Sequence, residues 1–509
     1  MPAAAAPETV AKLIQDFLGE APRAVVREDG EVVFDFASAR YSLSTEHGKC
    51  VLHLWSQERN AVRRVLDAEQ KEGTLRLEVL RFGRSAPDRL ELCRDRDERT
   101  PSARRAARTR YQKLLERALL RHFPGARPER FTTAMDLERS FGPIHTRGLL
   151  RHGNSSFAVL GVNAGEMQAA VDASLTFGLL WLDHCRRDAR ALVEGLALFV
   201  PPQSSAVLRE RMAQLDHAAA KFRLYEFHEG DLALEELDCR DRGNIATRLV
   251  RCPDQVAVRD RFGAQIEQVR AIVPDCEVAV LSSYELSFRL RGLEFACARL
   301  AADPHAFRNP AQLVFGAPPQ ETVVSEENLG DFRAFARMLS AARCSGADQS
   351  NALFRMHPER WLESLVIQDL SRLDHRLLPA PVYSQVPAFS ASDRAMIDVL
   401  GLTHDKRLAV IELKADEDIH LPLQGIDYWA RVAWHHQRRE FRQFGYFAGC
   451  ELSAEPPLLL LVAPALRVHP ATDALLRYIS PEIECELLGI DERWREELKV
   501  VFRKRPQPL

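Results

Sequence analysis

Two short apolar stretches in the last part of this 509-residue chain each contain isolated charged side chains. They are Ala395–Leu400, with Asp398, and Leu408–Asp416, with Glu412 and Lys414. We expect both to be β-strands, in which side chains alternate between faces, so that Glu412 and Lys414 point the same way. Two carboxylates and an ammonium are costly to bury unless something uses them. A divalent metal held by the carboxylates, with the ammonium beside an attacking water, is such a use.

This pattern resembles the active site of the PD-(D/E)xK nuclease superfamily, whose core motif is an Asp followed by a strand with Glu-x-Lys. Gln424 and Tyr428 add the Gln-x-x-x-Tyr pattern of RecB-like members on the following helix, where a spacing of four places both on one face. Glu363 lies on an upstream helix, where the superfamily often carries an extra acidic ligand. The resemblance covers the last third of the chain, and Ile397 stands where the motif has Pro.

The resemblance implies a nuclease that uses Mg²⁺ or Mn²⁺. Asp398 and Glu412 would bind the ion, the main-chain carbonyl of Leu413 could be a third ligand, and Glu363 could bind a second ion. Because Mg²⁺ keeps several of its waters, this small number of protein ligands is sufficient to bind it. Lys414 would orient or activate the attacking water. Gln424 and Tyr428 would contact the site or the substrate backbone.

Each of these residues also has a structural interpretation. Glu363 could be a solvated residue on an amphipathic helix. Gln424 and Tyr428 could cap the core, where a Tyr hydroxyl usually finds some partner. Asp398, Glu412 and Lys414 could form a structural ion pair in a domain that is not catalytic.

An internal repeat gives these residues a comparison within the chain. Residues 157–185 align without a gap on residues 408–436, at an offset of 409 − 158 = 251. We infer that an upstream segment is a second copy of the nuclease fold that has lost its catalytic groups. The alternative is that two α/β segments share a generic pattern. The alignment pairs Glu412 with Gly161, Lys414 with Asn163, Asp398 with Arg147 and Gln424 with Ala173, and Glu363 with Glu116 further upstream.

The length predicts several domains, because single cores seldom grow beyond about 250–300 residues. We expect a multidomain α/β protein whose C-terminal domain has a restriction-endonuclease-like core with a central mixed sheet. The predicted units are a small β-rich domain at 1–100, the degenerate copy at 108–230, an intervening α/β domain or linker at 231–350, and the catalytic domain at 351–509.

Composition excludes several classes of protein. The formal net charge of −3 argues against a polycation that binds nucleic acid indiscriminately. The ten cysteines form no Cys-x-x-Cys and predict free thiols in a reducing compartment. The N-terminus lacks a secretory signal, and no apolar run reaches the ~20 residues that span a bilayer. We therefore expect a cytoplasmic protein that is not attached to a membrane.

These observations predict a metal-dependent nuclease that hydrolyses phosphodiester bonds, in DNA rather than RNA, by nicking or structure-specific cleavage. Repair, recombination or defence would be its setting, and a homodimer is one option for its assembly. Two alternatives stay open. One is a ligand-activated RNase or defence nuclease, and the other is a non-catalytic scaffold that binds nucleic acid.

Overall fold

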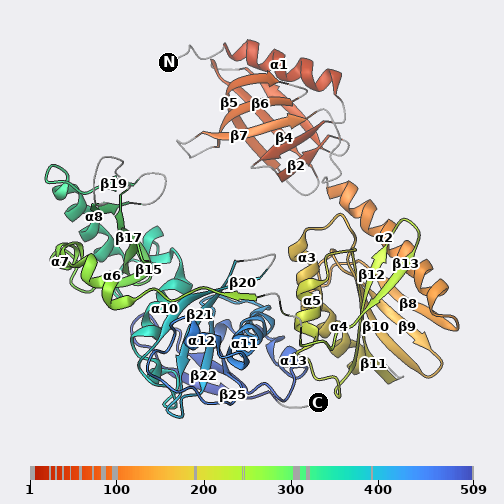
Figure 1. Ribbon diagram of the computed structural model, residues 1–509. Coiled ribbons are helices and arrows are strands. Elements are labelled where there is room, and N and C mark those ends of the chain that lie inside the picture. Colours follow the sequence, from red (N-terminus) through yellow and green to blue (C-terminus); the bar gives the residue numbers. More distant parts are fainter. Residues whose placement is uncertain are drawn as a thin grey trace.

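The computed structural model describes residues 6–21, 24–28, 31–36, 39–45, 48–56, 60–71, 74–81, 87–93, 101–188, 192–243, 245, 247–301, 310–316, 321–390 and 394–506. Within these ranges the chain forms four sheets with associated helices (Figure 1), which confirms the predicted multidomain α/β class. No helix in the same ranges is long and apolar enough to cross a membrane.

The first sheet is antiparallel throughout and has the strand order β2-β1-β7-β6-β5-β4-β3. Helix α1 (Pro7–Glu20) begins with a proline, whose fixed φ suits a first helical turn, and packs against β4 and β5. The predicted boundary at residue 100 lies outside the described residues. The strands are β1 Val25–Glu28, β2 Glu31–Asp35, β3 Arg40–Ser44, β4 Cys50–Trp55, β5 Asn60–Lys71, β6 Thr74–Arg81 and β7 Asp88–Cys93.

The second and last sheets have the same plan. Both contain six strands that follow chain order across the sheet, with the first three antiparallel, the next two added in parallel and the sixth antiparallel. The second sheet consists of β8 Ala126–Thr132, β9 Thr146–His152, β10 Ser155–Gly161, β11 Leu192–Val200, β12 Lys221–His228 and β13 Ala233–Leu237. The corresponding six strands of the last sheet, which has β14 (Thr247–Leu249) as a seventh at its edge, are β20 Tyr383–Ser390, β21 Arg394–Leu402, β22 Leu408–Leu413, β23 Leu458–Pro464, β24 Cys485–Ile490 and β25 Val500–Lys504.

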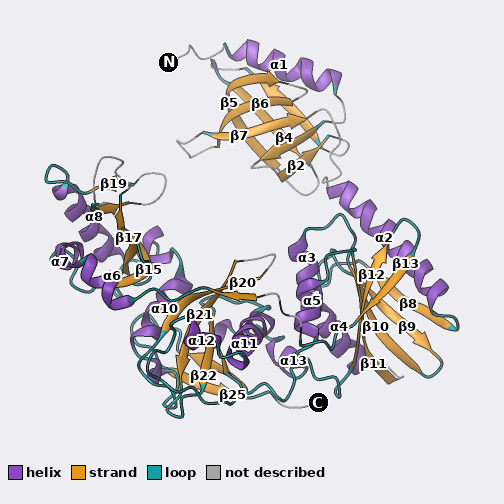
Figure 2. Ribbon diagram, in the orientation of Figure 1, coloured by secondary structure: helices purple, strands orange, loops and turns teal. Residues whose placement is uncertain are grey.

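The helices of these two sheets also correspond (Figure 2). Each parallel connection needs a crossover, and in both sheets a helix supplies it. One long helix precedes each sheet, one joins the third strand to the fourth, and a short one lies between the fourth and fifth. These are α2 Pro101–His122, α4 Ser174–Asp188 and α5 Ala206–Met212 for the second sheet, and α10 Pro358–Gln368, α11 Leu421–Gln437 and α13 Thr472–Leu476 for the last. Short helices α3 Gln168–Asp172, α9 Ala352–Arg355 and α12 Glu440–Gln443 lie beside them.

The segment between the two related units contributes strands to three different sheets. Strand β13 completes the second sheet, and β14 (Thr247–Leu249) pairs with β20 at the edge of the last sheet. Such short strands leave little periodic signal in a sequence. The rest forms a third, antiparallel sheet of β15 Glu277–Ser282, β16 Glu285–Leu290, β17 Leu293–Leu300, β18 Ala311–Phe315 and β19 Thr322–Val323, with helices α6 Gln255–Arg261, α7 Gly263–Arg270 and α8 Leu329–Ala342.

This third unit is anchored to the beginning of α10. The buried guanidinium of Arg343 donates hydrogen bonds to the carbonyl oxygens of Leu353 and Met356, at 2.8 and 2.6 Å. Gly292 has φ of +74°, and a Cβ there would lie 2.0 Å from the carbonyl oxygen of Arg360. Only glycine permits this approach. The contact therefore fixes the helix on which Glu363 lies.

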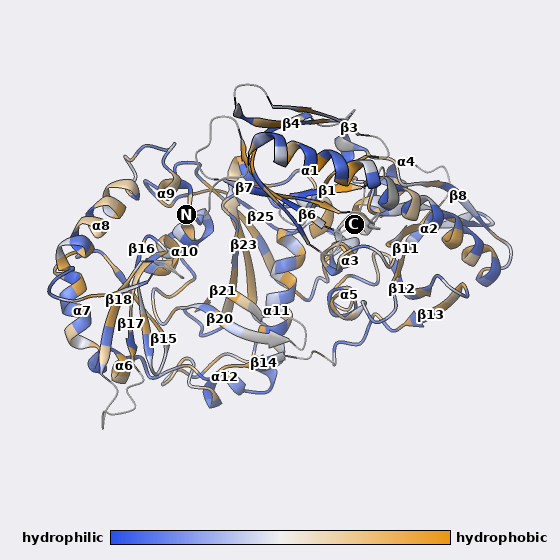
Figure 3. Cartoon of the chain, turned by 90° about the horizontal axis from the view of Figure 1, so that it is seen from above, coloured by the Kyte–Doolittle hydropathy of each residue, from blue (hydrophilic) through white to orange (hydrophobic). Residues whose placement is uncertain are grey.

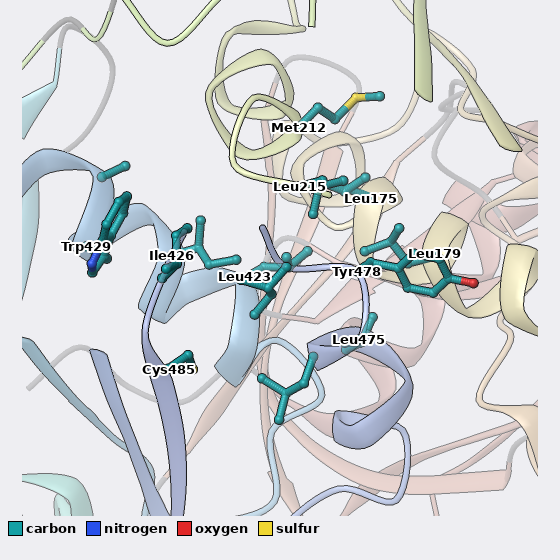
Figure 4. Close-up of a cluster of buried hydrophobic side chains, with 14 of the residues drawn as sticks. Leu175, Leu179, Met212, Leu215, Leu423, Ile426, Trp429, Leu475, Tyr478 and Cys485 are labelled. Carbon is teal, nitrogen blue, oxygen red and sulfur yellow. The ribbon is translucent and has the colours of Figure 1, made fainter. Parts of the chain in front are cut away.

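The second and last units share one hydrophobic core (Figure 4). Helix α4 contacts α13, and α5 contacts α11. Because α4 corresponds to α11 and α5 to α13, each of these two contacts is the counterpart of the other. Two main-chain hydrogen bonds join the segment that follows α5 to the segment that follows α13. Asp216 N–H donates to Tyr478 O at 2.8 Å, and Ser480 N–H donates to Gln214 O at 2.9 Å. This arrangement has the reciprocal form of a twofold interface within one chain.

Candidate active site

Strand β22 lies in the middle of the last sheet, and all six of its residues are buried. Ala409 and Ile411 join one core cluster, and Leu408 and Val410 join the other, so both faces of the strand are covered. Such a strand is expected to be continuously apolar, and Figure 3 shows the neighbouring strand β23 in the hydrophobic colour. Glu412 is the exception. It shares a face with Val410, the face that α11 covers, and its side chain is 1% exposed.

Asp398 lies beside Glu412 on the neighbouring strand. The pairing of Val399 with Ile411 places Asp398 at the position opposite Glu412. Its Oδ2 accepts a hydrogen bond from the main-chain N–H of Leu413 at 3.1 Å. The structure therefore brings together the two carboxylates that the sequence singled out.

Lys414 follows β22 and faces the same carboxylates. Its Nζ lies 3.3 Å from Oε1 of Glu412 and 3.7 Å from Oδ2 of Asp418. The other oxygen of Glu412, Oε2, is buried and has no hydrogen-bond partner among the described residues. One carboxylate oxygen in the middle of the protein is thus left without a donor.

The charges in this site interact strongly. Burial raises the pKa of Glu412 well above its ordinary range, the carboxylate of Asp398 raises it further, and Lys414 offsets only part of the shift. Burial alone would lower the pKa of Lys414, but the carboxylates of Glu412 and Asp418 outweigh it and raise that pKa. The surroundings thus stabilise the protonated form of Lys414 and destabilise the charged form of Glu412. This indicates an excess of negative charge, which a bound metal ion would reduce.

Helix α11 places Tyr428 near these carboxylates. The pKa of the Tyr428 hydroxyl is raised by burial first, and then by the negative charges of Glu412 and Asp398. Gln424 lies one turn earlier on α11, and its Oε1 is buried without a hydrogen-bond partner in the described part of the chain. Tyr428 therefore lies at the predicted site, and the amide of Gln424 has an acceptor to spare.

Glu363 joins the group through a residue that the sequence did not reveal. Its Oε2 accepts hydrogen bonds from Nη1 of Arg360 and from Nε2 of Gln385, both at 2.9 Å. The same Nε2 of Gln385 lies 3.3 Å from Oδ1 of Asp398. Gln385 is the cross-strand neighbour of Asp398, so that only the register of β20 on β21 could have identified it. Asp418 was also missed, because its loop position follows no motif.

Among the residues that the structure describes, no three His, Cys, Asp or Glu side chains converge closely enough to hold one ion. A metal ion bound by Asp398 and Glu412 would therefore need main-chain oxygens and waters for its other ligands. Glu363 lies at the periphery of this pair.

Gly161, which the alignment pairs with Glu412, faces the other side of its sheet. A Cβ on Gly161 would lie 2.5 Å from the hydroxyl oxygen of Tyr111 and 2.9 Å from Cδ2 of Leu115, both on α2. Glu412 instead faces α11, the counterpart of α4. On the α4 face the second sheet has the buried side chain of Leu160, so an apolar residue lies where the last sheet has Glu412.

An ion pair lies beside Tyr111 in the second unit. Nε of Arg108 lies 2.7 Å from Oε1 of Glu166, which also accepts a hydrogen bond from Nδ2 of Asn163 at 3.4 Å. Arg147 pairs with Leu160 and lies over Trp181 of α4, on the face that corresponds to Asp398, as the alignment predicts. The predicted pairing of Glu412 with Gly161 is wrong by one residue, because the turn between β9 and β10 is shorter than the one between β21 and β22.

Glu277, at the beginning of β15, approaches Glu363 from the third unit. Burial raises its pKa to about 7, although Ser364 and Arg289 lower it, and the carboxylate of Glu363 raises it further. A raised carboxyl pKa favours the protonated form in the folded protein. Its stabilising contribution is thus complete below the unfolded pKa near 4.5 and is lost as the pH rises through about 7.

We therefore expect the melting temperature of the wild-type protein to fall between pH 5 and pH 8 more steeply than that of Glu277→Gln. The difference corresponds to about 3 kcal/mol at most, since one pKa unit is worth about 1.4 kcal/mol. Thermal melts of both proteins across this pH range measure it. Parallel curves would contradict the assignment to Glu277.

Comparisons with known proteins add little. No protein-family model matches the chain, and no curated protein matches it. A solved structure titled "Structure of EndoMS-dsDNA2 complex" aligns over 43% of this chain and 93% of that one, at 14% sequence identity and a TM-score of 0.20. At this TM-score the likeness carries no argument, so the assignment of function depends on the side chains described above.

Proposed function

We propose that this chain is a metal-dependent nuclease that hydrolyses phosphodiester bonds at the site formed by β21, β22 and α11. The observation that supports the proposal most is the state of Glu412, a buried carboxylate beside Asp398 with one oxygen that has no partner in the described residues. Burying such a group is costly unless it is neutralised. One lysine faces two carboxylates here, and the remaining negative charge fits a divalent cation.

The donor set suits Mg²⁺ or Mn²⁺. Both ions prefer oxygen ligands, and the free Oε2 of Glu412 and the carboxylate of Asp398 supply them. A divalent ion held there would neutralise charge on a phosphoryl oxygen and make a water more acidic. Glu363 would assist from the periphery, and the carbonyl of Leu413 would complete the protein ligands.

Lys414 would act through its charge. The neighbouring carboxylates raise its pKa, which keeps the ammonium protonated in the metal-free site. It can donate a hydrogen bond that orients the attacking water, and it can balance the negative charge that develops on the phosphoryl group. Gln424 and Tyr428 offer an amide and a hydroxyl at the same place for contacts with the substrate backbone.

We propose DNA as the substrate and single-strand nicking as the outcome. The second unit has Leu160 and Arg147 where the last unit has Glu412 and Asp398, so that a duplex that spans both units would be cut on one strand only. Repair, recombination or defence would each need such an activity.

The test uses purified full-length protein, supercoiled plasmid and an RNA of matched sequence, with Mg²⁺ or Mn²⁺. We expect open-circular plasmid to form before any linear product. Linear plasmid that forms without a nicked intermediate would refute the single-site proposal. No cleavage of either nucleic acid with either ion would refute the proposed function and favour the non-catalytic scaffold.

A further inference from the structure

We infer that Gln385 is a positioning residue that couples Glu363 to the Asp398–Glu412 pair and thereby sets the metal affinity of the site. This inference depends on the proposed function. Gln385 belongs to none of the motifs in the sequence, and its role follows from its place on β20.

The register of β20 on β21 places Gln385 directly opposite Asp398. Ser384 pairs with Val399 and Val386 pairs with Ile397, on either side of this position. Gln385 has φ of +52°, in the left-handed region that a non-glycine residue inside a strand rarely adopts. Such a conformation costs about 1–3 kcal/mol and persists where the surroundings fix it, often at functional sites.

The side-chain amide of Gln385 bridges two carboxylates of different elements. Its Nε2 is 2.9 Å from Oε2 of Glu363 on α10 and 3.3 Å from Oδ1 of Asp398 on β21. An NH₂ group has two hydrogens, so both bonds can form at once. Gln385 is thus the one side chain in the described site that bonds to both the peripheral and the central acid.

These bonds are compatible with a bound ion. Arg360 and Gln385 both bond to Oε2 of Glu363, which leaves Oε1 for another partner. Each oxygen of Asp398 accepts one hydrogen bond, from Gln385 or from Leu413 N–H, and each carboxylate oxygen has a further lone pair. Donors of this kind orient metal-binding carboxylates, and their loss typically weakens metal affinity by about 10–100-fold.

Without Gln385, Arg360 would be the only donor among the described residues that bonds to the Glu363 carboxylate. Arg360 is on the same helix, three residues away, so that this ion pair holds Glu363 to α10 and not to the sheet. We therefore expect the site to bind metal more weakly when the bridge is removed, although both central carboxylates are intact.

The experiment measures Mn²⁺ binding to the full-length protein by calorimetry or electron paramagnetic resonance. Gln385→Met keeps the length of the side chain and removes the amide, and Gln385→Gly removes it while relieving the positive φ, in case the first variant does not fold. Gln443→Met on α12, where the side chain is exposed, is the matched control. We expect about 10-fold weaker binding or more in the Gln385 variants, wild-type affinity in the control, and cleavage that recovers at high Mn²⁺.

Recovery at high Mn²⁺ separates positioning from general damage to the fold, which added metal would not repair. Unchanged or tighter Mn²⁺ binding in both Gln385 variants would overturn the inference and leave the proposed function standing. Failure of the wild-type protein to bind Mn²⁺ would instead overturn the proposed function, and the inference with it.

Discussion

Glu412→Gln is expected to abolish cleavage and, at the same time, to raise the melting temperature of the metal-free protein at pH 8. The substitution keeps the shape of the side chain and removes the charge. A metal ligand would be lost, and we expect activity to fall by about 1,000-fold or more, because metal assistance is worth several kcal/mol. Stability should rise, since the folded protein favours the uncharged form of this buried group.

The matched control is Glu486→Gln on β24, which lies two strands away from β22 in the same sheet. Glu486 is also buried, but it is paired: Nη2 of Arg505 lies 2.7 Å from its Oε1, and Nη2 of Arg376 lies 3.0 Å from the same oxygen. Removing this charge should lower the melting temperature and leave cleavage intact. Cleavage by Glu412→Gln at the wild-type rate would refute the assignment of the site. A fall in its melting temperature would show that Glu412 is stabilised by its surroundings.

In the Asp427→Ala variant, the second and last units are expected to separate at a much lower temperature than in the wild-type protein. Asp427 of α11 accepts two hydrogen bonds from Arg211 of α5, at 2.9 Å from Nε and 2.7 Å from Nη2. The exposed fractions of the two side chains are 15% and 11%. Removal of one member of a buried pair leaves an uncompensated charge and costs about 3–5 kcal/mol.

The comparison for this prediction is Asp473→Ala. Its partner Lys504 forms an ion pair in which the side chains are 44% and 45% exposed, and such surface pairs contribute about 0–1 kcal/mol. Differential scanning calorimetry of both variants gives the result directly. An equal effect of the two substitutions would mean that the contact between α5 and α11 contributes no more than a surface pair.

The sequence was sufficient to predict the fold class and the strand β22 because their signals are local. A six-residue apolar strand that contains one glutamate and is followed by a lysine can be recognised without knowing which strands lie beside it. The roles of Asp398, Glu412, Lys414, Gln424 and Tyr428 are still predictions, although the structure places the first three side chains and Tyr428 together.

What the sequence could not supply depends on pairing between strands. Gln385 can be identified only when β20 is set against β21, and Leu160 replaces Gly161 as the counterpart of Glu412 only when the lengths of two turns are compared. Tyr111 is a similar case. It lies 50 residues before Gly161 in the sequence, and nothing in either segment indicates that its ring fills the space beside that glycine.

The reciprocal main-chain contact between Gln214–Asp216 and Tyr478–Ser480 has a consequence for how the protein behaves on dilution. In a dimer of separate chains, two such units would dissociate at low concentration and could exchange partners. Here the connecting chain keeps their effective concentration high at every total concentration. The ratio of one unit with the Asp398–Glu412 pair to one unit without it is therefore fixed when the chain is synthesised, and no mixture of subunits can place two such pairs across this interface.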